Sequence, residues 1–137
     1  MKLRNTVLAA AMLAMVPLSA QSGETAGSPI VELMPHVKQL RPSLGLNAQQ
    51  DRVIDSWIAE APARRKAMEA EMLELRAQMR EAILSNRSRM VRERLKARLA
   101  DKQSRLIEMR ALCARMLRNT LTAEQFARVV ESYRATI

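Results

Sequence analysis

The sequence predicts an all-α protein in which long central helices form an antiparallel helical hairpin. Helix-forming Ala, Leu, Met, Arg, Glu and Gln dominate the chain, which contains only three Gly, and this composition favours helices. Apolar residues recur at alternating steps of three and four over two long stretches, the period of a helical packing seam. Aromatic residues make up only 2% of the chain, which indicates a thin core. A thin helical layer needs a partner to bury its apolar stripe, so we expect a homodimer.

The N-terminus has the features of a secretory signal peptide. Lys2 and Arg4 form a basic start, residues 6–16 are almost continuously apolar, and small residues follow up to Ala20. The apolar run is shorter than the ~20 residues that span a bilayer. We therefore expect export to the periplasm, with cleavage near Ala20 removing residues 1–20.

The rest of the chain has the length of one small domain. Residues 21–29 are small and polar without any periodicity, and we expect a disordered leader there. Residues 30–137 then form a single helical domain.

A short first helix is predicted ahead of the long ones. Ser28 and Pro29 offer an N-cap and a first helical residue, and Pro35 is expected to kink the helix. Arg41-Pro42 and Gly45 are expected to end it. Its apolar residues are Ile30, Leu33, Met34, Val37 and Leu40.

Two long seams follow, joined by a predicted turn at residues 85–88. Each seam contains one basic residue, Arg65 in the first and Lys102 in the second. Pro62 is expected to bend or restart the helix that carries the first seam. Because the seams are of equal length and the connection is short, we expect them to pack antiparallel. The apolar positions of the first seam are Ile54, Ile58, Ala61, Met68, Met72, Leu75, Met79 and Ala82. Those of the second are Leu95, Leu99, Leu106, Met109, Cys113 and Met116.

A short phrase that predicts a helix start occurs on both sides of this pair of seams. The downstream copy is Leu121-Thr122-Ala123-Glu124-Gln125. Thr122 is placed as the N-cap and Gln125 as the N3 partner of a capping box, while Leu121 and Phe126 are spaced as a hydrophobic staple. The phrase starts a last helix whose apolar face is Phe126, Val129, Val130 and Tyr133.

The upstream copy is Leu46-Asn47-Ala48-Gln49-Gln50. Asn47 is a good N-cap and Gln50 occupies the N3 position of a second capping box. Leu46 is placed for a staple, but Asp51 stands where its apolar partner is needed. The upstream copy is therefore partial, whereas the downstream copy is complete.

With these two phrases the chain resembles the periplasmic LTxxQ-motif proteins of the Spy/CpxP group. In that family, paired Leu-Thr-x-x-Gln phrases bracket an antiparallel helical hairpin, and the resemblance covers residues 30–133, with Asn47 where the family usually has Thr. It implies a four-helix, cradle-shaped dimer that binds unfolded or misfolded envelope proteins without ATP, as a chaperone or an envelope-stress accessory. It also implies two alternatives, because the group is related to periplasmic heavy-metal sensor and resistance proteins. One is a regulatory subunit for a membrane sensor kinase or anti-sigma partner, and the other is a soft-metal binding protein.

Charge points to the surface that binds such clients. The formal net charge is +9, and removal of Lys2 and Arg4 leaves +7. The densest run of basic residues, residues 87–98, has two interpretations. One is an ordinary solvent-exposed helix face without a binding role. The other is an electropositive surface for acidic clients or anionic lipid head groups. Flexible Met residues lie among the basic ones and suit a surface that accepts many shapes. The predicted client-binding residues are Arg87, Arg89, Met90, Arg92, Arg94, Lys96 and Arg98.

The metal alternative rests on three sulfur-bearing residues. Met109, Cys113 and Met116 share one helix face and are spaced within reach of one Cu(I) ion. The same three residues are consecutive seam positions, where Cys behaves as a small apolar residue, and this core interpretation is the stronger one. The only His, His36, lacks the companion nitrogen ligands of a nickel, cobalt or zinc site.

Neither catalysis nor nucleic-acid binding is expected from the sequence. The single His and single Cys lie on different predicted helices and match no local catalytic signature, and no phosphate-binding Gly loop is present. The Arg residues are not interleaved with aromatic residues that could stack on bases. We therefore expect a protein without enzymatic activity, and no resident cofactor beyond the possible Cu(I).

Overall fold

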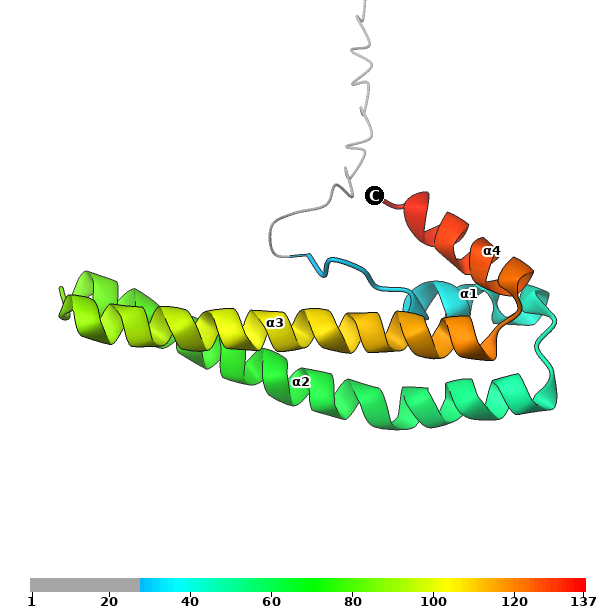
Figure 1. Cartoon of the computed structure of the whole chain (residues 1–137), viewed down its shortest axis with the longest axis horizontal. Helices are drawn as coiled ribbons and strands as arrows, with labels where there is room; N and C mark the ends of the chain where they lie inside the picture. Colours follow the sequence, from blue (N-terminus) through cyan, green and yellow to red (C-terminus); the bar gives the residue numbers. More distant parts are fainter. Residues whose placement is uncertain (1–27) are drawn as a thin grey trace, which may run out of the picture.

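The structure, a computed structural model, describes residues 28–137. All the regular secondary structure in this range is α-helical. Four helices are present in this part of the chain: α1 (Met34–Leu44), α2 (Ala48–Leu84), α3 (Arg89–Thr120) and α4 (Ala123–Arg134) (Figure 1). The expected signal segment and residues 21–27 of the expected leader lie outside the described residues.

Helix α1 begins later than the sequence predicts. Its N-cap is Leu33 rather than Ser28, and Pro35 lies in the first turn. A proline is accommodated in the first turn because its missing N–H has no intrahelical acceptor there. The predicted start and the predicted kink at Pro35 are therefore wrong. The predicted end is right only in part. Arg41 and Pro42 do not end the helix, which continues through them to Leu44, whereas Gly45 follows it in the left-handed conformation with φ 64°.

Helices α2 and α3 are long and lie side by side along most of their length (Figure 1). Helix α2 has 37 residues and continues through Pro62, and its axis changes direction partway along. The connection at residues 85–88 is short, as predicted. The Arg87 N–H donates to the Ala82 carbonyl (2.9 Å), and Asn86 takes a positive φ of 50°.

Buried apolar side chains form two separate groups. The larger one, here called the base cluster, joins all four helices where α1 and α4 meet the long pair. It consists of Leu33, Val37, Leu44, Ile54, Leu117, Leu121 and Val129. The smaller one lies near the turn and consists of Leu75, Ala82 and Leu95.

The two basic residues inside the predicted seams are both paired. Lys102 of α3 forms an ion pair with Glu71 of α2, which lowers the pKa of that carboxyl. Arg65 of α2 forms an ion pair with Glu32, in the segment before α1 (2.8 Å). A partly buried charge is tolerated when an oppositely charged partner compensates for its lost hydration. Arg65 and Lys102 can therefore occupy seam positions between the base cluster and the smaller cluster.

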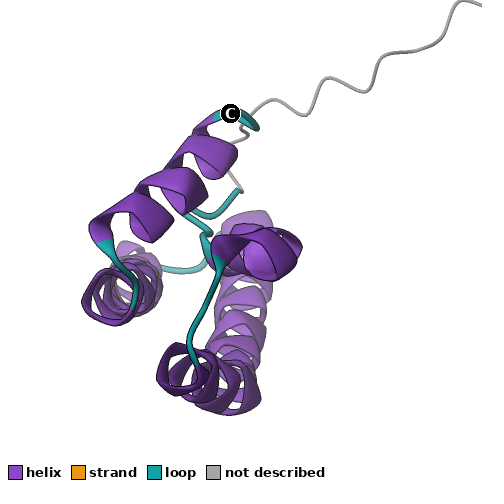
Figure 2. Cartoon of the chain, turned by 90° about the vertical axis from the view of Figure 1, so that its right-hand side faces the viewer, coloured by secondary structure: helices purple, strands orange, loops and turns teal. Residues whose placement is uncertain are grey.

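Both helix-to-helix connections at the base lie close together. Figure 2 looks at the molecule from this end and shows the loops that lead into α2 and α4 in the foreground. Among the described residues, none of the helices is both long enough and apolar enough to cross a membrane.

Candidate functional site

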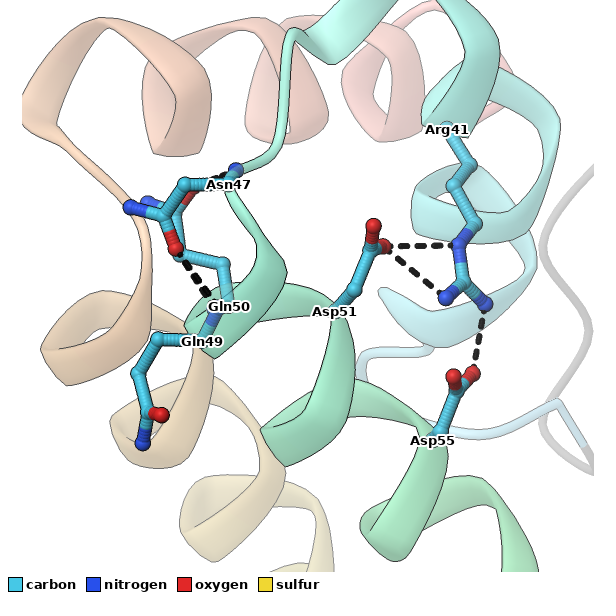
Figure 3. Close-up of polar contacts among 6 residues, drawn as sticks. All are labelled: Arg41, Asn47, Gln49, Gln50, Asp51 and Asp55. Atoms are coloured by element: carbon cyan, nitrogen blue, oxygen red, sulfur yellow. Dashed lines mark hydrogen bonds and ion pairs between the residues drawn. The ribbon is translucent and has the colours of Figure 1, made fainter.

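Both capping boxes that the sequence predicts are formed. At the start of α2, the Asn47 side chain accepts hydrogen bonds from the backbone N–H groups of Gln49 (3.0 Å) and Gln50 (2.9 Å), and the Gln50 Oε1 accepts from the Asn47 N–H (2.9 Å) (Figure 3). At the start of α4, the Thr122 hydroxyl accepts from the Gln125 N–H (3.2 Å), and the Gln125 Oε1 accepts from the Thr122 N–H (2.9 Å). Each box satisfies N–H groups that have no acceptor within their own helix.

The two boxes also bind each other through their glutamine amides. The Gln50 Nε2 donates to the carbonyl of Thr120, at the end of α3 (3.0 Å), and to the Gln125 Oε1 (2.9 Å). The Gln125 Nε2 donates to the carbonyls of Leu44 (3.0 Å) and Gly45 (3.3 Å), at the end of α1. Each glutamine thus caps the start of its own helix and the end of a helix from the other half of the chain. We call residues 44–50 and 120–125 the helix junction.

Apolar packing surrounds these hydrogen bonds. Leu121 is buried in the base cluster, and Leu46 and Phe126 pack against that cluster from partly exposed positions. Gln50 itself is only 7% exposed. Water therefore competes little for its amide, which raises the cost of losing a partner.

Ion pairs join α1 to the first two turns of α2 beside the junction. The Arg41 guanidinium contacts the carboxylates of Asp51 (2.9 Å) and Asp55 (2.7 Å) (Figure 3). The hydrogen bond from Arg41 is the main cause that lowers the pKa of Asp55. Asp51, which stands where a hydrophobic staple needs an apolar residue, thus ties α1 and α2 together by charge instead.

Glu32 makes a second connection that the sequence does not indicate. Its Oε1 accepts from Arg65 Nη1 on α2 (2.8 Å) and from Arg110 Nη1 on α3 (2.9 Å). Burial alone raises the pKa of Glu32, but the hydrogen bonds and positive charges of Arg110 and Arg65 outweigh it, so the pKa is lowered overall. Glu69 adds a weaker ion pair to Arg110 (3.9 Å). The segment before α1 is thereby fastened to both long helices.

The predicted client-binding residues lie at the turn and along the first turns of α3. All are exposed except Arg92, whose guanidinium donates to the Arg87 carbonyl. Lys96 forms an ion pair with Glu93 of the same helix (3.0 Å). Met90, which the seam pattern leaves outside the packed face, is 64% exposed.

Large apolar side chains accompany these cations to an extent that the sequence pattern did not reveal. Around the turn, Ile83, Leu84, Met90 and Val91 are exposed, and farther along the long helices so is Leu73. Leu84 is 75% exposed although it is the last residue of α2. Leu84 lies two positions beyond the buried seam residue Ala82 and therefore off the seam, and this spacing is the signal in the sequence that could have identified it.

The three sulfur-bearing residues of the metal hypothesis are partly buried. Cys113 and Met116 pack against the base cluster, and burial is the main cause that raises the pKa of the Cys113 thiol. Met109 is also partly buried. Among the described residues, no group of three or more His, Cys, Asp or Glu side chains is placed to hold a metal ion. His36 packs α1 against α4 through a hydrogen bond to Ser132 (2.9 Å).

The comparisons with known proteins leave the resemblance to the LTxxQ-motif family as a hypothesis. No family model, no curated protein and no solved structure matches this sequence.

Proposed function

We propose that this protein is an exported, ATP-independent chaperone-like protein that binds unfolded or misfolded envelope proteins. One observation carries the proposal: within residues 28–137, nine large apolar side chains are exposed while only ten apolar side chains are buried. A small soluble domain that leaves so much apolar surface open is expected to bind a partner there. The exposed apolar side chains are Ile30, Leu73, Ile83, Leu84, Met90, Val91, Ile107, Leu112 and Ile137.

Charge supports a protein partner with acidic segments. The exposed cations at the start of α3 attract such a chain over a long range, and this attraction speeds capture. Isolated apolar contacts then hold it weakly, because each contact buries little area. Weak contacts on an open surface allow a client to leave and fold, which an ATP-independent mechanism requires.

The finer architecture is part of the same proposal. We propose that α2 and α3 act as the antiparallel hairpin of a cradle and that two copies pair to form it. The resemblance of the two capping phrases to the LTxxQ pattern supports this arrangement. The exposed Leu73, Ile107 and Leu112 along the long helices offer apolar surface for the second copy or for the client.

Light scattering tests the proposal. A chemically denatured client is diluted into buffer with and without the protein that lacks residues 1–20, at low and at high salt. We expect suppression of aggregation that weakens as salt rises, since salt screens exposed charges. Arg89→Gln combined with Arg94→Gln should weaken suppression, whereas Lys66→Gln, an exposed charge on α2, should not. Absence of suppression at several-fold molar excess would contradict the proposal and favour the regulatory alternative.

A further inference from the structure

The turn between α2 and α3 forms an end of the molecule with unusual surface chemistry. Four large apolar side chains, Ile83, Leu84, Met90 and Val91, are exposed within nine residues of sequence on both sides of residues 85–88. We call these four residues the apolar tip. Figure 1 shows this turn at the opposite end of the long helices from α1 and α4.

Positive charge surrounds the apolar tip. Residues 80–98 contain seven basic and two acidic residues, a net charge of +5 out of the chain's +9. Of the cations around the turn, Arg80, Arg87 and Arg89 are exposed, whereas the Arg92 guanidinium donates to the Arg87 carbonyl. Their long side chains can keep the guanidinium groups in water while apolar neighbours enter a less polar medium.

We propose that the apolar tip with Arg80, Arg87 and Arg89 docks on the surface of an anionic phospholipid bilayer. Interfacial binding needs apolar side chains that enter the boundary between head groups and acyl chains and cations that meet the phosphates, and the tip offers both. The end of a long helical pair can meet a broad flat surface such as a bilayer. An extended client chain makes more contacts along the sides of the helices than at their end. Docking in this way holds α2 and α3 end-on, with the helix junction about 55 Å along α2 from the membrane.

This inference goes beyond the chaperone proposal, because it assigns the apolar tip a different partner. Docking would also place the predicted client-binding residues of α3 next to the membrane. Ile83 and Leu84 are outside the client-binding residues predicted from the sequence but belong to the exposed apolar side chains that support the chaperone proposal. Vesicle binding and suppression of aggregation are therefore both measured on the same variants, which separates the two activities.

Vesicle co-sedimentation tests the docking. The probes are vesicles of phosphatidylglycerol mixed with phosphatidylcholine and vesicles of phosphatidylcholine alone. The protein lacks residues 1–20, so that the apolar run at residues 6–16 cannot mimic docking. We expect binding about 150-fold tighter to the anionic vesicles, weakened by salt, since each of the three cations contributes about 1 kcal/mol near an anionic surface. Arg80→Gln with Arg87→Gln should then weaken binding about 30-fold.

Substitution of the apolar tip gives the sharper arm of the test. Leu84→Ser should weaken vesicle binding about tenfold, because a largely exposed Leu that enters the interface buries most of its apolar surface. Leu73→Ser is the matched control, since Leu73 is 67% exposed on the same helix but away from the turn. Both variants should keep the wild-type melting temperature, because neither side chain is part of a core cluster.

Depth is measured with brominated lipids. A Leu84→Trp variant should be quenched by bromine near the head groups. Trp57, about 40 Å away along α2, should not be quenched and serves as the internal reference. Failure to bind anionic vesicles, equal losses for Leu84→Ser and Leu73→Ser, or an unquenched Trp at position 84 would each overturn the proposal. The proposal would also be overturned if Leu84→Ser abolished suppression of client aggregation but left vesicle binding intact. The apolar tip would then bind the client and not the membrane.

Discussion

Removal of the Gln50 side chain should destabilise the protein far more than removal of its exposed neighbour. Gln50→Ala deletes three hydrogen bonds: from the amide to the Thr120 carbonyl, from the amide to the Gln125 Oε1, and from the Asn47 N–H to the Gln50 Oε1. Each is expected to contribute about 1 kcal/mol net, so the loss is about 3 kcal/mol. That is a large share of the 5–15 kcal/mol typical of a small domain.

Chemical denaturation followed by circular dichroism measures this loss. Gln49→Ala is the matched control, because Gln49 is exposed and its side chain accepts only a surface hydrogen bond from Arg52 (2.7 Å). A surface substitution of this kind should change the free energy of unfolding by less than about 0.5 kcal/mol. Combining Gln50→Ala with Gln125→Ala should cost less than the sum of the single changes, because the two amides share a hydrogen bond.

A nearly isosteric variant separates hydrogen bonding from volume. Gln50→Glu keeps the size and the acceptor but replaces the donating amide with a carboxylate that faces two acceptor oxygens, those of Thr120 and Gln125. At neutral pH it should be at least as destabilising as Gln50→Ala, and acidification should recover part of the loss because a protonated carboxyl can donate. If Gln50→Ala and Gln49→Ala had equal midpoints, the helix junction would not stabilise the fold and our reasoning about it would be refuted.

Three further outcomes are expected. Thr122→Ala should cost about 1 kcal/mol by thermal melting, and an unchanged melt would show that its capping hydrogen bond is without effect. Glu32→Gln should destabilise the protein at neutral pH by leaving Arg65 and Arg110 without their shared carboxylate. Because the folded pKa of Glu32 lies below the usual 4.5, its contribution is complete above that value and is lost as pH falls through the lower folded pKa; a difference between wild type and variant that persists at low pH would contradict this assignment. The Cys113 thiol should react with a thiol reagent more slowly in the folded protein than in urea, since burial raises its pKa, and equal rates would show that it is open.

The features that the sequence predicted well depend on neighbouring residues. Capping boxes, the turn and the glycine that ends α1 are all determined within a few residues, so their residue types reveal them. The seams were predictable in part, because a helix repeats its contacts every seven residues. Ile54, Leu75, Ala82 and Leu95 are buried as predicted, whereas Met68, Met72, Leu106 and Met109 are only partly buried and belong to neither cluster. Pro35 was misjudged, since the same residue breaks a helix interior and suits a first turn, and only the position of the helix start decides between them.

The features that escaped prediction join distant parts of the chain. The amide of Gln50 and the oxygen of Gln125 meet across 75 residues, and Glu32 meets Arg110 across 78. Each of these side chains has an adequate local explanation as a cap or a surface charge, so nothing nearby signals the distant partner. Leu117 is similar: it is fully buried one position beyond the predicted seam, because the base cluster surrounds the end of α3 on more sides than a two-helix seam does.

The position of the helix junction has a consequence for the order in which the chain assembles. Pairing of α2 with α3 can begin beside the short turn and spread outward, since each new contact closes only a slightly longer loop. The junction joins residues 44–50 to residues 120–125, so it cannot close until the chain has been made past Gln125. Until then the base cluster lacks Leu121 and Val129, and its remaining apolar residues stay open to other chains. Aggregation of the newly made protein should therefore depend mainly on how soon residues 121–129 are made.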